Sequence, residues 1–331
     1  MENKTRDLLR EFLSSTAKSN SVESVMQSYA VTPEEAERLT EHLRESTEML
    51  GLINILPALD LEGVAGSLTA GGSLAKRSAP NQQRLPRNVS TEGVPFECQR
   101  TEYDASVPYH LLDNWGTARF PDFQQKLERA LLEQQGLDML TVGFNGTNAA
   151  VVTDPVANTS LEDVNIGWLQ KLRESAPERV KTGVTIGTGG DYSTLDELVY
   201  DAIQLLDPCH RKRPGNVVMI DRDLLHTKLL ANAKSAEESS LAQLVLTRIL
   251  ASNQIAGLPI FDAPGFPAGK VFVTSLSNLS IYVQGQRRFI KDQPNLNRLY
   301  CYSAQSEAYV VEDDTRCGLI EGIEFLPTEE P

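Results

Sequence analysis

The segment from Phe123 to Asn145 has the clearest helical pattern in this chain, and a helix of that length restricts how the remaining elements can pack. Its apolar residues recur at steps of three and four, with polar residues between them. The predicted apolar positions are Phe123, Leu127, Ala130, Leu131, Leu137, Leu140 and Phe144. Asn145-Gly146 is typical of a helix end, and Gly136 weakens the helix locally and is a candidate for a bend.

The wider stretch from Pro121 to Arg179 holds none of the residue sets that catalysis needs. It contains no nucleophile with a neighbouring base, no group of metal ligands and no phosphate loop. A long helix without such chemistry indicates an architectural role, in which Phe144 and Trp168 are expected to anchor the packing.

The charge balance argues against nucleic-acid binding as the main function of this chain. Asp and Glu number 45 against 31 Lys and Arg, which gives a net charge of −14, whereas neutralising phosphates requires surplus cations. One interpretation is an ordinary acidic protein. The other is a surface that lies near nucleic acid without adhering to it. Neither involves sequence-specific binding of nucleic acid.

Length and cysteine usage narrow the class further. With 331 residues, 40% of them hydrophobic, the chain exceeds the roughly 250–300 residues at which single cores split, so two lobes with appendages are expected. Its four cysteines form no Cys-x-x-Cys pair, which fits free and mostly buried thiols. The N-terminus lacks the apolar run of a signal peptide, and no stretch approaches the ~18 apolar residues of a membrane span.

Residues 1–50 have the pattern of several short helices. Val22, Val25, Met26 and Tyr29 recur at helical spacing. Thr32-Pro33-Glu34-Glu35 then has the pattern of a capping box, in which Thr32 caps the helix, Pro33 takes its first position and Glu35 reaches back. We expect a polar arm of several helices that either docks on another surface or is removed.

Residues 60–100 combine glycine and serine with the basic residues Lys76, Arg77, Arg84 and Arg87. The segment cannot bury a core of its own. Two interpretations stay open: a disordered linker, or a long hairpin that becomes ordered against a neighbouring subunit. Because the chain as a whole is acidic, the local positive charge favours contact with an acidic partner surface.

From Thr182 onward the pattern alternates between helices and strands. A helix is predicted from Ser193-Thr194 to about Leu206, and Asn216–Ile220 has the composition of a buried strand. Further helices are expected at 223–230 and 241–250. The other predicted strands cover residues 271–273, 281–283, 308–311 and 319–325.

Two glycine-containing segments invite comparison with phosphate-binding loops. Gly265–Lys270 has three residues between its glycines instead of four, and Val271 stands where a Ser or Thr would bind Mg²⁺, so we predict an ordinary turn before a strand. In Gly187–Tyr192, the bulky Tyr192 occupies the place of the third glycine of a dinucleotide turn. We predict a flexible entry into the second lobe at this point.

The remaining candidates for chemistry are weak. Cys209 lies near the basic run Arg211–Arg213, which favours a reactive thiolate, although a surface turn between two prolines explains the segment better. Glu312–Asp314 is better explained as a charged loop than as a metal site, because no further ligand follows at a suitable spacing. We therefore assign no catalytic, cofactor-binding or metal-binding residue and expect no cofactor.

A set of short strings, each weak alone, is specific in its order along the chain. The strings are Asp122-Phe123-Gln124, Leu137-Asp138, Gly143-Phe144-Asn145-Gly146, Gly167-Trp168-Leu169-Gln170-Lys171, Ala176-Pro177, Gly189-Gly190-Asp191-Tyr192, Asn278-Leu279-Ser280-Ile281-Tyr282 and Tyr309-Val310-Val311-Glu312-Asp313. From about Thr32 to Glu321 the chain resembles the major capsid proteins of the P-two-like tailed phages. It departs from that pattern in a shorter 180–187 segment and a shorter C-terminal tail.

The resemblance implies an α+β subunit with the Hong Kong ninety-seven-like capsid fold. Residues 1–55 would form an N-terminal arm, 56–105 an extended loop over a neighbouring subunit, and 106–187 a peripheral domain with the 123–145 helix as its spine. Residues 188–268 would form the axial domain, 269–326 the strands that return to the peripheral domain and flank the spine helix, and 327–331 a tail.

The resemblance also implies a function and partners. The chain would self-assemble into hexamers and pentamers of an icosahedral shell around double-stranded DNA, and its acidic charge would face that DNA. Its other partners would be a scaffolding protein with a protease, which trims the arm near Tyr29-Ala30, and a portal protein; no membrane is involved. The shell would assemble in the bacterial host cytoplasm and become the virion capsid. The alternatives are an α/β enzyme with a site in the 187–230 region and an adaptor that never forms shells.

Overall fold

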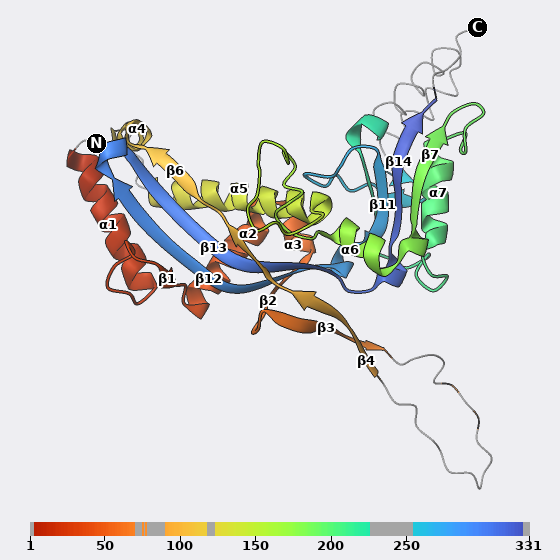
Figure 1. Ribbon diagram of the computed structural model, residues 1–331, viewed down its shortest axis with the longest axis horizontal. Helices are drawn as coiled ribbons and strands as arrows, with labels where there is room; N and C mark the ends of the chain where they lie inside the picture. The colour runs from red at the N-terminus through yellow and green to blue at the C-terminus, as the bar shows by residue number, and fades with distance from the viewer. Residues whose placement is uncertain are drawn as a thin grey trace.

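The computed structural model describes residues 3–69, 75, 77, 90–117, 123–225 and 254–326. The described residues form two lobes, each built on one sheet, and a hairpin that leaves the body at one edge (Figure 1). Helices and strands both contribute to the lobes, as the α+β prediction requires.

The larger sheet is built on a long antiparallel pair, β12 (Leu279–Gln293) and β13 (Arg298–Val311). A bulge between Gln284 and Arg287, where Gly285 has a φ of 65°, interrupts the pairing. The short strands β1 (Tyr29–Ala30) and β2 (Asn54–Pro57) pair with β12, and β5 (Gln99–Glu102) and β6 (Ala105–Pro108) pair with β13. The predicted strands 281–283 and 308–311 are confirmed, but each is only one part of a much longer strand.

A single long helix, α5 (Phe123–Asn145), runs along this sheet and confirms the prediction for that segment (Figure 1). The helices around it are α1 (Asn3–Ser19), α2 (Pro33–Ser46), α3 (Glu48–Leu52), α4 (Tyr109–Thr117) and α6 (Trp168–Ser175). Gly136 does not interrupt α5. A Cβ at Gly136 would lie 2.7 Å from Ser46 Oγ and 2.8 Å from Leu50 Cδ1, so this glycine lets α2 and α3 approach the helix closely.

The predicted apolar face of α5 is partly wrong. Leu127, Leu140 and Phe144 are buried, but Ala130 is exposed and Leu137 is 38% exposed. Leu132, Met139 and Val142 are buried instead. Because the sheet, α2, α3 and α6 enclose the helix from several sides, its buried positions do not follow one stripe.

The smaller sheet has the strand order β7 (Val180–Ile186), β14 (Gly318–Phe325), β11 (Lys270–Ser275) and β8 (Asn216–Ile220). The strands predicted at 216–220, 271–273 and 319–325 are therefore confirmed. β7 runs parallel to β14, and the other neighbours are antiparallel. The segment 269–326 thus supplies strands to both sheets.

One face of the smaller sheet is covered by α7 (Leu195–Leu205), which begins after Thr194 as predicted. The Thr194 hydroxyl accepts a hydrogen bond from the Glu197 amide at 3.3 Å and caps the helix. Residues 222–225 form a helical turn. The rest of the helix predicted at 223–230, and all of the one at 241–250, lie outside the described residues, and the short strands β9 (Gln254–Ile255) and β10 (Leu258–Pro259) follow.

The prediction of a helix at Val22–Tyr29 is wrong. α1 ends at Ser19, Ser21 has a φ of 54°, and the chain continues through turns into β1. Val25 and Tyr29 are buried, whereas Met26 is 51% exposed. The spacing of the apolar residues therefore reflects the points at which an irregular segment packs against the body, not one face of a helix. The backbone finds partners on β12 instead: the amide of Ile290 donates to the Val25 carbonyl at 2.8 Å.

The predicted start of α2 is confirmed, but its capping box is not formed. Thr32 is the N-cap residue, with Pro33 at the first helical position, yet its side chain makes no capping hydrogen bond. Glu35 pairs with Arg38 at 2.6 Å instead of reaching back to the cap. Arg38, three residues further along the helix, thus binds the Glu35 carboxylate in place of the cap.

Candidate assembly surfaces

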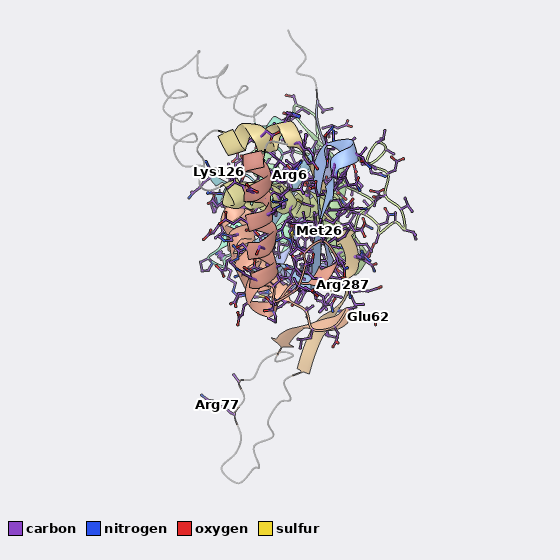
Figure 2. All side chains as sticks on the ribbon, turned by 90° about the vertical axis from the view of Figure 1, so that its left-hand side faces the viewer. Arg6, Met26, Glu62, Arg77, Lys126 and Arg287 are labelled. Carbon is purple, nitrogen blue, oxygen red and sulfur yellow. The ribbon has the colours of Figure 1, made fainter. Side chains whose placement is uncertain are left out.

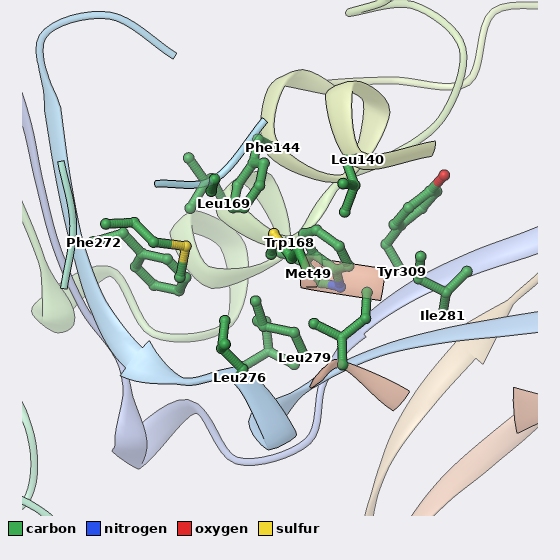
Figure 3. Packing of buried hydrophobic residues seen from close by; sticks show 14 of the residues in the cluster. Met49, Leu140, Phe144, Trp168, Leu169, Phe272, Leu276, Leu279, Ile281 and Tyr309 are labelled. Carbon is green, nitrogen blue, oxygen red and sulfur yellow. The ribbon is translucent and has the colours of Figure 1, made fainter. Parts of the chain in front are cut away.

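The two lobes meet at Trp168, the first residue of α6, which is fully buried (Figure 3). Its ring packs edge-on against Phe144 and Tyr309, with centroid distances of 5.3 and 5.4 Å. Its Nε1 donates a hydrogen bond to the Ser280 carbonyl at 3.1 Å. The packing role predicted for Trp168 and Phe144 is confirmed, and the junction is a rigid frame that holds the surfaces described below.

Glycines allow the backbone segments beside this junction to touch. A Cβ at Gly146 would lie 2.2 Å from the Asn165 carbonyl oxygen, and a Cβ at Gly167 would lie 2.4 Å from the Gly143 carbonyl oxygen. The end of α5 and the start of α6 are therefore in direct backbone contact. The strings Gly143–Gly146 and Gly167–Lys171 are explained by this close approach.

A buried carboxyl group links the junction to the larger sheet. Glu307 is 0% exposed and accepts hydrogen bonds from the Gln305 amide at 2.6 Å, the Tyr103 hydroxyl at 2.7 Å and the Tyr309 hydroxyl at 2.9 Å. Burial raises the pKa of Glu307, and the three donors partly oppose this rise. The Glu307 backbone carbonyl also accepts from Asn165 Nδ2 at 2.9 Å.

The first exposed surface is the hairpin of β3 (Glu62–Thr69) and β4 (Ser90–Glu97). Its base is fixed by Phe96, whose ring stacks on Tyr282 with a centroid distance of 4.4 Å. Figure 2 places Arg77 well outside the body, beyond Glu62. Near the base, Leu59 is 93% and Val64 is 64% exposed. Residues 62–69 and 90–97 pair as the hairpin interpretation requires, while its ordering against a neighbouring subunit stays a prediction; nearly all of 70–89 lies outside the described residues.

The second exposed surface is the connection between α5 and α6, residues 147–166, which we call the valine loop. Val151, Val152 and Val156 are 103%, 85% and 86% exposed. In Figure 1 this loop rises on one side of α5, whereas the hairpin leaves the opposite edge of the subunit. The sequence reasoning missed this surface. Its only local signal is four valines, the exposed three among them, in a segment that has neither helical nor strand periodicity.

The third surface is the N-terminal arm, which packs on the far end of the larger sheet. Leu9 and Val25 are buried in a cluster with Leu127 of α5 and Leu299 of β13. The predicted processing residues, Tyr29 and Ala30, lie together in β1, where they pair with Arg288 and Arg287. Tyr29 is buried and Ala30 is exposed.

The two glycine-containing segments are turns. In the first, Gly187 and Gly189 have φ values of 139° and 85°, and the Asp191 carboxylate accepts from the amide and hydroxyl of Thr185 at 2.9 and 3.0 Å. In the second, Gly265 and Gly269 have φ values of 73° and 65°, just before β11. The turn predicted at Gly265–Lys270 is confirmed.

Neither Cys209 nor the acidic triplet has acquired a catalytic setting among the described residues. Cys209 is exposed, and the neighbouring Arg211 guanidinium donates to the carbonyls of Leu206 and Gln204 at 2.8 and 2.7 Å, so it caps the end of α7. Asp313 accepts from the Thr315 amide at 3.1 Å and pairs with Arg316 at 3.2 Å. In the described ranges no three His, Cys, Asp or Glu residues gather as a metal site, and no helix could span a bilayer.

Comparison with known proteins gives one consistent result. Residues 8–323 match the family described as "Phage major capsid protein, P2 family". The chain is 34% identical over 343 residues to the "Capsid proteins" of Escherichia phage P2, with 98% of this chain and 95% of that one covered. It is 34% identical over 347 residues to the major capsid protein of Serratia phage KSP20, with 99% of each covered.

Solved structures agree with these relatives. A chain of the satellite phage P4 procapsid, which includes the size determination (Sid) protein, matches with a TM-score of 0.78 at 32% identity, over 98% of this chain and 99% of that chain. The capsid of an empty GTA particle matches with a TM-score of 0.52 at 12% identity, over 83% and 89%, and supports the fold alone.

The predicted resemblance is confirmed, and the enzyme in the 187–230 region and the adaptor are set aside, because the matching family consists of structural capsid proteins. The fold is the Hong Kong ninety-seven-like capsid fold, and the place of the protein is the virion capsid. This chain belongs to the P2 family of phage major capsid proteins.

Proposed function

We propose that this major capsid protein builds its shell from hexamers and pentamers that enclose double-stranded DNA. The observation that carries the proposal is the β3–β4 hairpin, which leaves its own body (Figure 1), with Val64 of β3 and Leu59 near its base exposed to solvent. A monomer gains nothing from such a projection, whereas a neighbouring subunit can bury it. Many modest contacts of this kind, repeated around a capsomer, supply the energy of assembly.

The parts of the subunit then take distinct roles. Residues 1–55 act as the arm and 56–105 as the loop over a neighbour. Residues 106–187 and 269–326 form the peripheral domain, 188–268 the axial domain around capsomer axes, and 327–331 a tail. In the smaller sheet, β8 of segment 188–268 is joined by β7, β11 and β14 of the two flanking segments, so the proposed axial domain shares its sheet with them.

The arm is proposed to be trimmed near Tyr29-Ala30 by a protease that acts with the scaffolding protein. Both residues are paired with β12, so a protease reaches the bond only after β1 leaves the sheet. Mass spectrometry of mature particles tests this step. The expected N-terminus lies close to Ala30, and particles whose chains begin at Met1 or Glu2 would refute the cleavage.

The net charge of −14 fits a shell that confines DNA without adsorbing it. An acidic inner face repels phosphates within a Debye length of ~8–10 Å, which keeps packaged DNA free to leave through a portal protein. Mapping charge onto a reconstructed shell tests this idea. A strongly basic inner face would contradict it.

Assembly itself is tested by expressing the chain with its scaffolding partner and viewing the product by negative-stain microscopy. Closed shells or tubes are expected from the wild-type chain. Replacing Leu59 and Val64 together by serine should reduce their number, while a matched exposed residue outside the hairpin, in Leu137→Ser, should not. Persistent wild-type monomers would contradict the proposed function.

A further inference from the structure

The valine loop presents an apolar cluster that the subunit leaves uncovered. Val151, Val152 and Val156 are each at least 85% exposed, although they lie within a few residues of one another. Scattered exposed apolar residues are ordinary, but clustered ones mark contact surfaces. The side chains of these three valines are almost entirely in solvent, so they add little to the packing of their own subunit.

The loop is held in one shape by hydrogen bonds to its own backbone. The Asp163 carboxylate, which is buried, accepts from the Asp154 amide at 2.7 Å, and the Asp154 carboxylate accepts from the amides of Val156 and Ala157 at 3.0 and 3.2 Å. Both ends are tied as well, since the Thr147 amide donates to the Glu162 carbonyl at 2.7 Å. A partner therefore meets a pre-ordered surface and bears little ordering cost.

The loop is also negatively charged. Residues 147–166 include Asp154, Glu162 and Asp163 but no Lys or Arg. In the part of the chain that the structure describes, the partners of these three carboxylates are backbone amides of the loop itself. Within the described ranges, no salt bridge pairs these carboxylates with a cation, and a basic, partly apolar segment would complement the surface.

Such a segment exists in the hairpin of this chain. Residues 70–89 contain Lys76, Arg77, Arg84 and Arg87, no Asp or Glu, and apolar residues such as Leu74 and Leu85. The strands β3 and β4 leave the body at the edge opposite the valine loop of the same subunit (Figure 1), and Arg77 lies outside the body in Figure 2. A second copy can bring its hairpin to the loop.

We propose that the valine loop of one subunit is the docking surface for residues 70–89 of a second copy. The inference rests on the proposed function, and it names the surface that receives the hairpin. A contact between two different surfaces on opposite edges of one subunit is heterologous, and repeated around an axis it closes into a ring. The apolar cluster supplies affinity, and the charges set orientation and register.

Cross-linking between two singly substituted chains tests this contact. In a Cys209→Ser background, which removes the exposed thiol, one chain carries Val152→Cys and the other carries Ser78→Cys. The two chains are co-expressed with the scaffolding partner, and the particles are treated with a short bismaleimide. Covalent heterodimers are expected on a denaturing gel, and neither variant alone should give dimers.

A chain that carries both cysteines should give a ladder of covalent oligomers from the same particles. Shells that form but give no heterodimer and no ladder would overturn the docking surface and leave the proposed function intact. A product within single chains would overturn it too, since the contact would then join a hairpin to its own loop. Absence of shells from the wild-type chain would overturn both proposals.

A second variant measures the contribution of the valines. Burying one valine changes an association constant by roughly tenfold, so Val151, Val152 and Val156 all replaced by serine should reduce shell yield by at least about tenfold. The matched control is Leu296→Ser, which removes an exposed apolar residue outside both surfaces. Unchanged yield from the triple variant would overturn the inference, provided circular dichroism shows the wild-type fold.

Discussion

The Cα of Gly143 lies against the indole ring of Trp168, so closely that a Cβ at Gly143 would come within 2.4 Å of Trp168 Cζ3. The indole is fully buried and held by its own hydrogen bond, so it cannot move aside. The contact joins the end of α5 to the start of α6. The close packing of α6 against α5 therefore depends on the absence of one side chain.

Gly143→Ala should destabilise the subunit. Overpacking costs about 1–3 kcal/mol, which outweighs a gain in helix propensity of at most about 1 kcal/mol. Chemical denaturation of the unassembled chain measures the difference. The control is Gly51→Ala in α3, where the nearest atom to the new Cβ would be 3.4 Å away and no loss is expected. Equal effects at both positions would show that the indole contact is unimportant.

Phe144→Ala should lower the free energy of unfolding by about 3–5 kcal/mol, because it leaves a cavity between the rings of Trp168 and Phe266. Phe144 is 1% exposed and packs edge-on against Trp168 and Phe266, both at 5.3 Å. Leu137→Ala on the exposed side of the same helix should cost much less. If Phe144→Ala left both stability and assembly unchanged, its anchoring role would be wrong.

The wild-type chain should lose stability as pH rises, because Glu307 must ionise while it is buried. Glu307→Gln should abolish this loss. The folded state raises the pKa of Glu307 above its ordinary value of 4.5 through burial, so the protonated form fits the folded state better. Stability from this group is fully present below that value and is lost as pH rises through the folded pKa. Unfolding measured from about pH 4 to about pH 8 should show a flatter profile for the variant. Parallel profiles would contradict the prediction.

Arg173→Met should have the opposite pH signature. Arg173 donates to both oxygens of Glu321 at 2.9 and 2.7 Å and joins α6 to β14. Burial acts to raise the pKa of Glu321, but Arg173 and Lys270 outweigh it and lower the pKa. Stability from Glu321 is therefore present above its ordinary pKa and lost as pH falls through the lowered pKa.

Without Arg173 the loss should begin at higher pH, and stability at neutral pH should fall by about 1.5–3 kcal/mol. The same denaturation series measures both effects. Arg129→Met is the matched control, since the Arg129–Glu133 pair is exposed and contributes less than about 1 kcal/mol. If Arg129→Met lowered stability as much as Arg173→Met, the loss would come from removing an arginine side chain in general and not from the ion pair with Glu321.

Sequence reasoning succeeded where local physics decides the structure. The helix at 123–145, the cap at Thr194 and the strand at 216–220 each follow from residues close together in the chain. It failed at Val22–Tyr29, where helical spacing was outweighed by pairing with β12, some 260 residues later. The number of residues between Tyr29 and Arg288 makes such a partner invisible to any local pattern.

The candidate surfaces divide in the same way. Composition alone predicts the basic hairpin segment, and the order of the short strings along the chain is enough to indicate its family. The valine loop was not predicted, because the exposure of Val151 and Val152 depends on whether other segments of the folded subunit pack against them. The role of Glu307 was missed for a related reason. Two of its donors, Gln305 and Tyr309, lie two residues away in the same strand, but the third donor, Tyr103, and the burial of the carboxylate come from distant parts of the chain.

The pairing of β1 and β2 with β12, and of β7 with β14, has a consequence for synthesis. Strands near the N-terminus cannot complete their sheet until the ribosome has released residues beyond 279, and β7 must wait for a strand that ends at Phe325. Such long-range closure is slow, and it comes at the end of translation. A truncated or still-growing chain therefore lacks both finished lobes, so the topology itself excludes incomplete subunits from the shell.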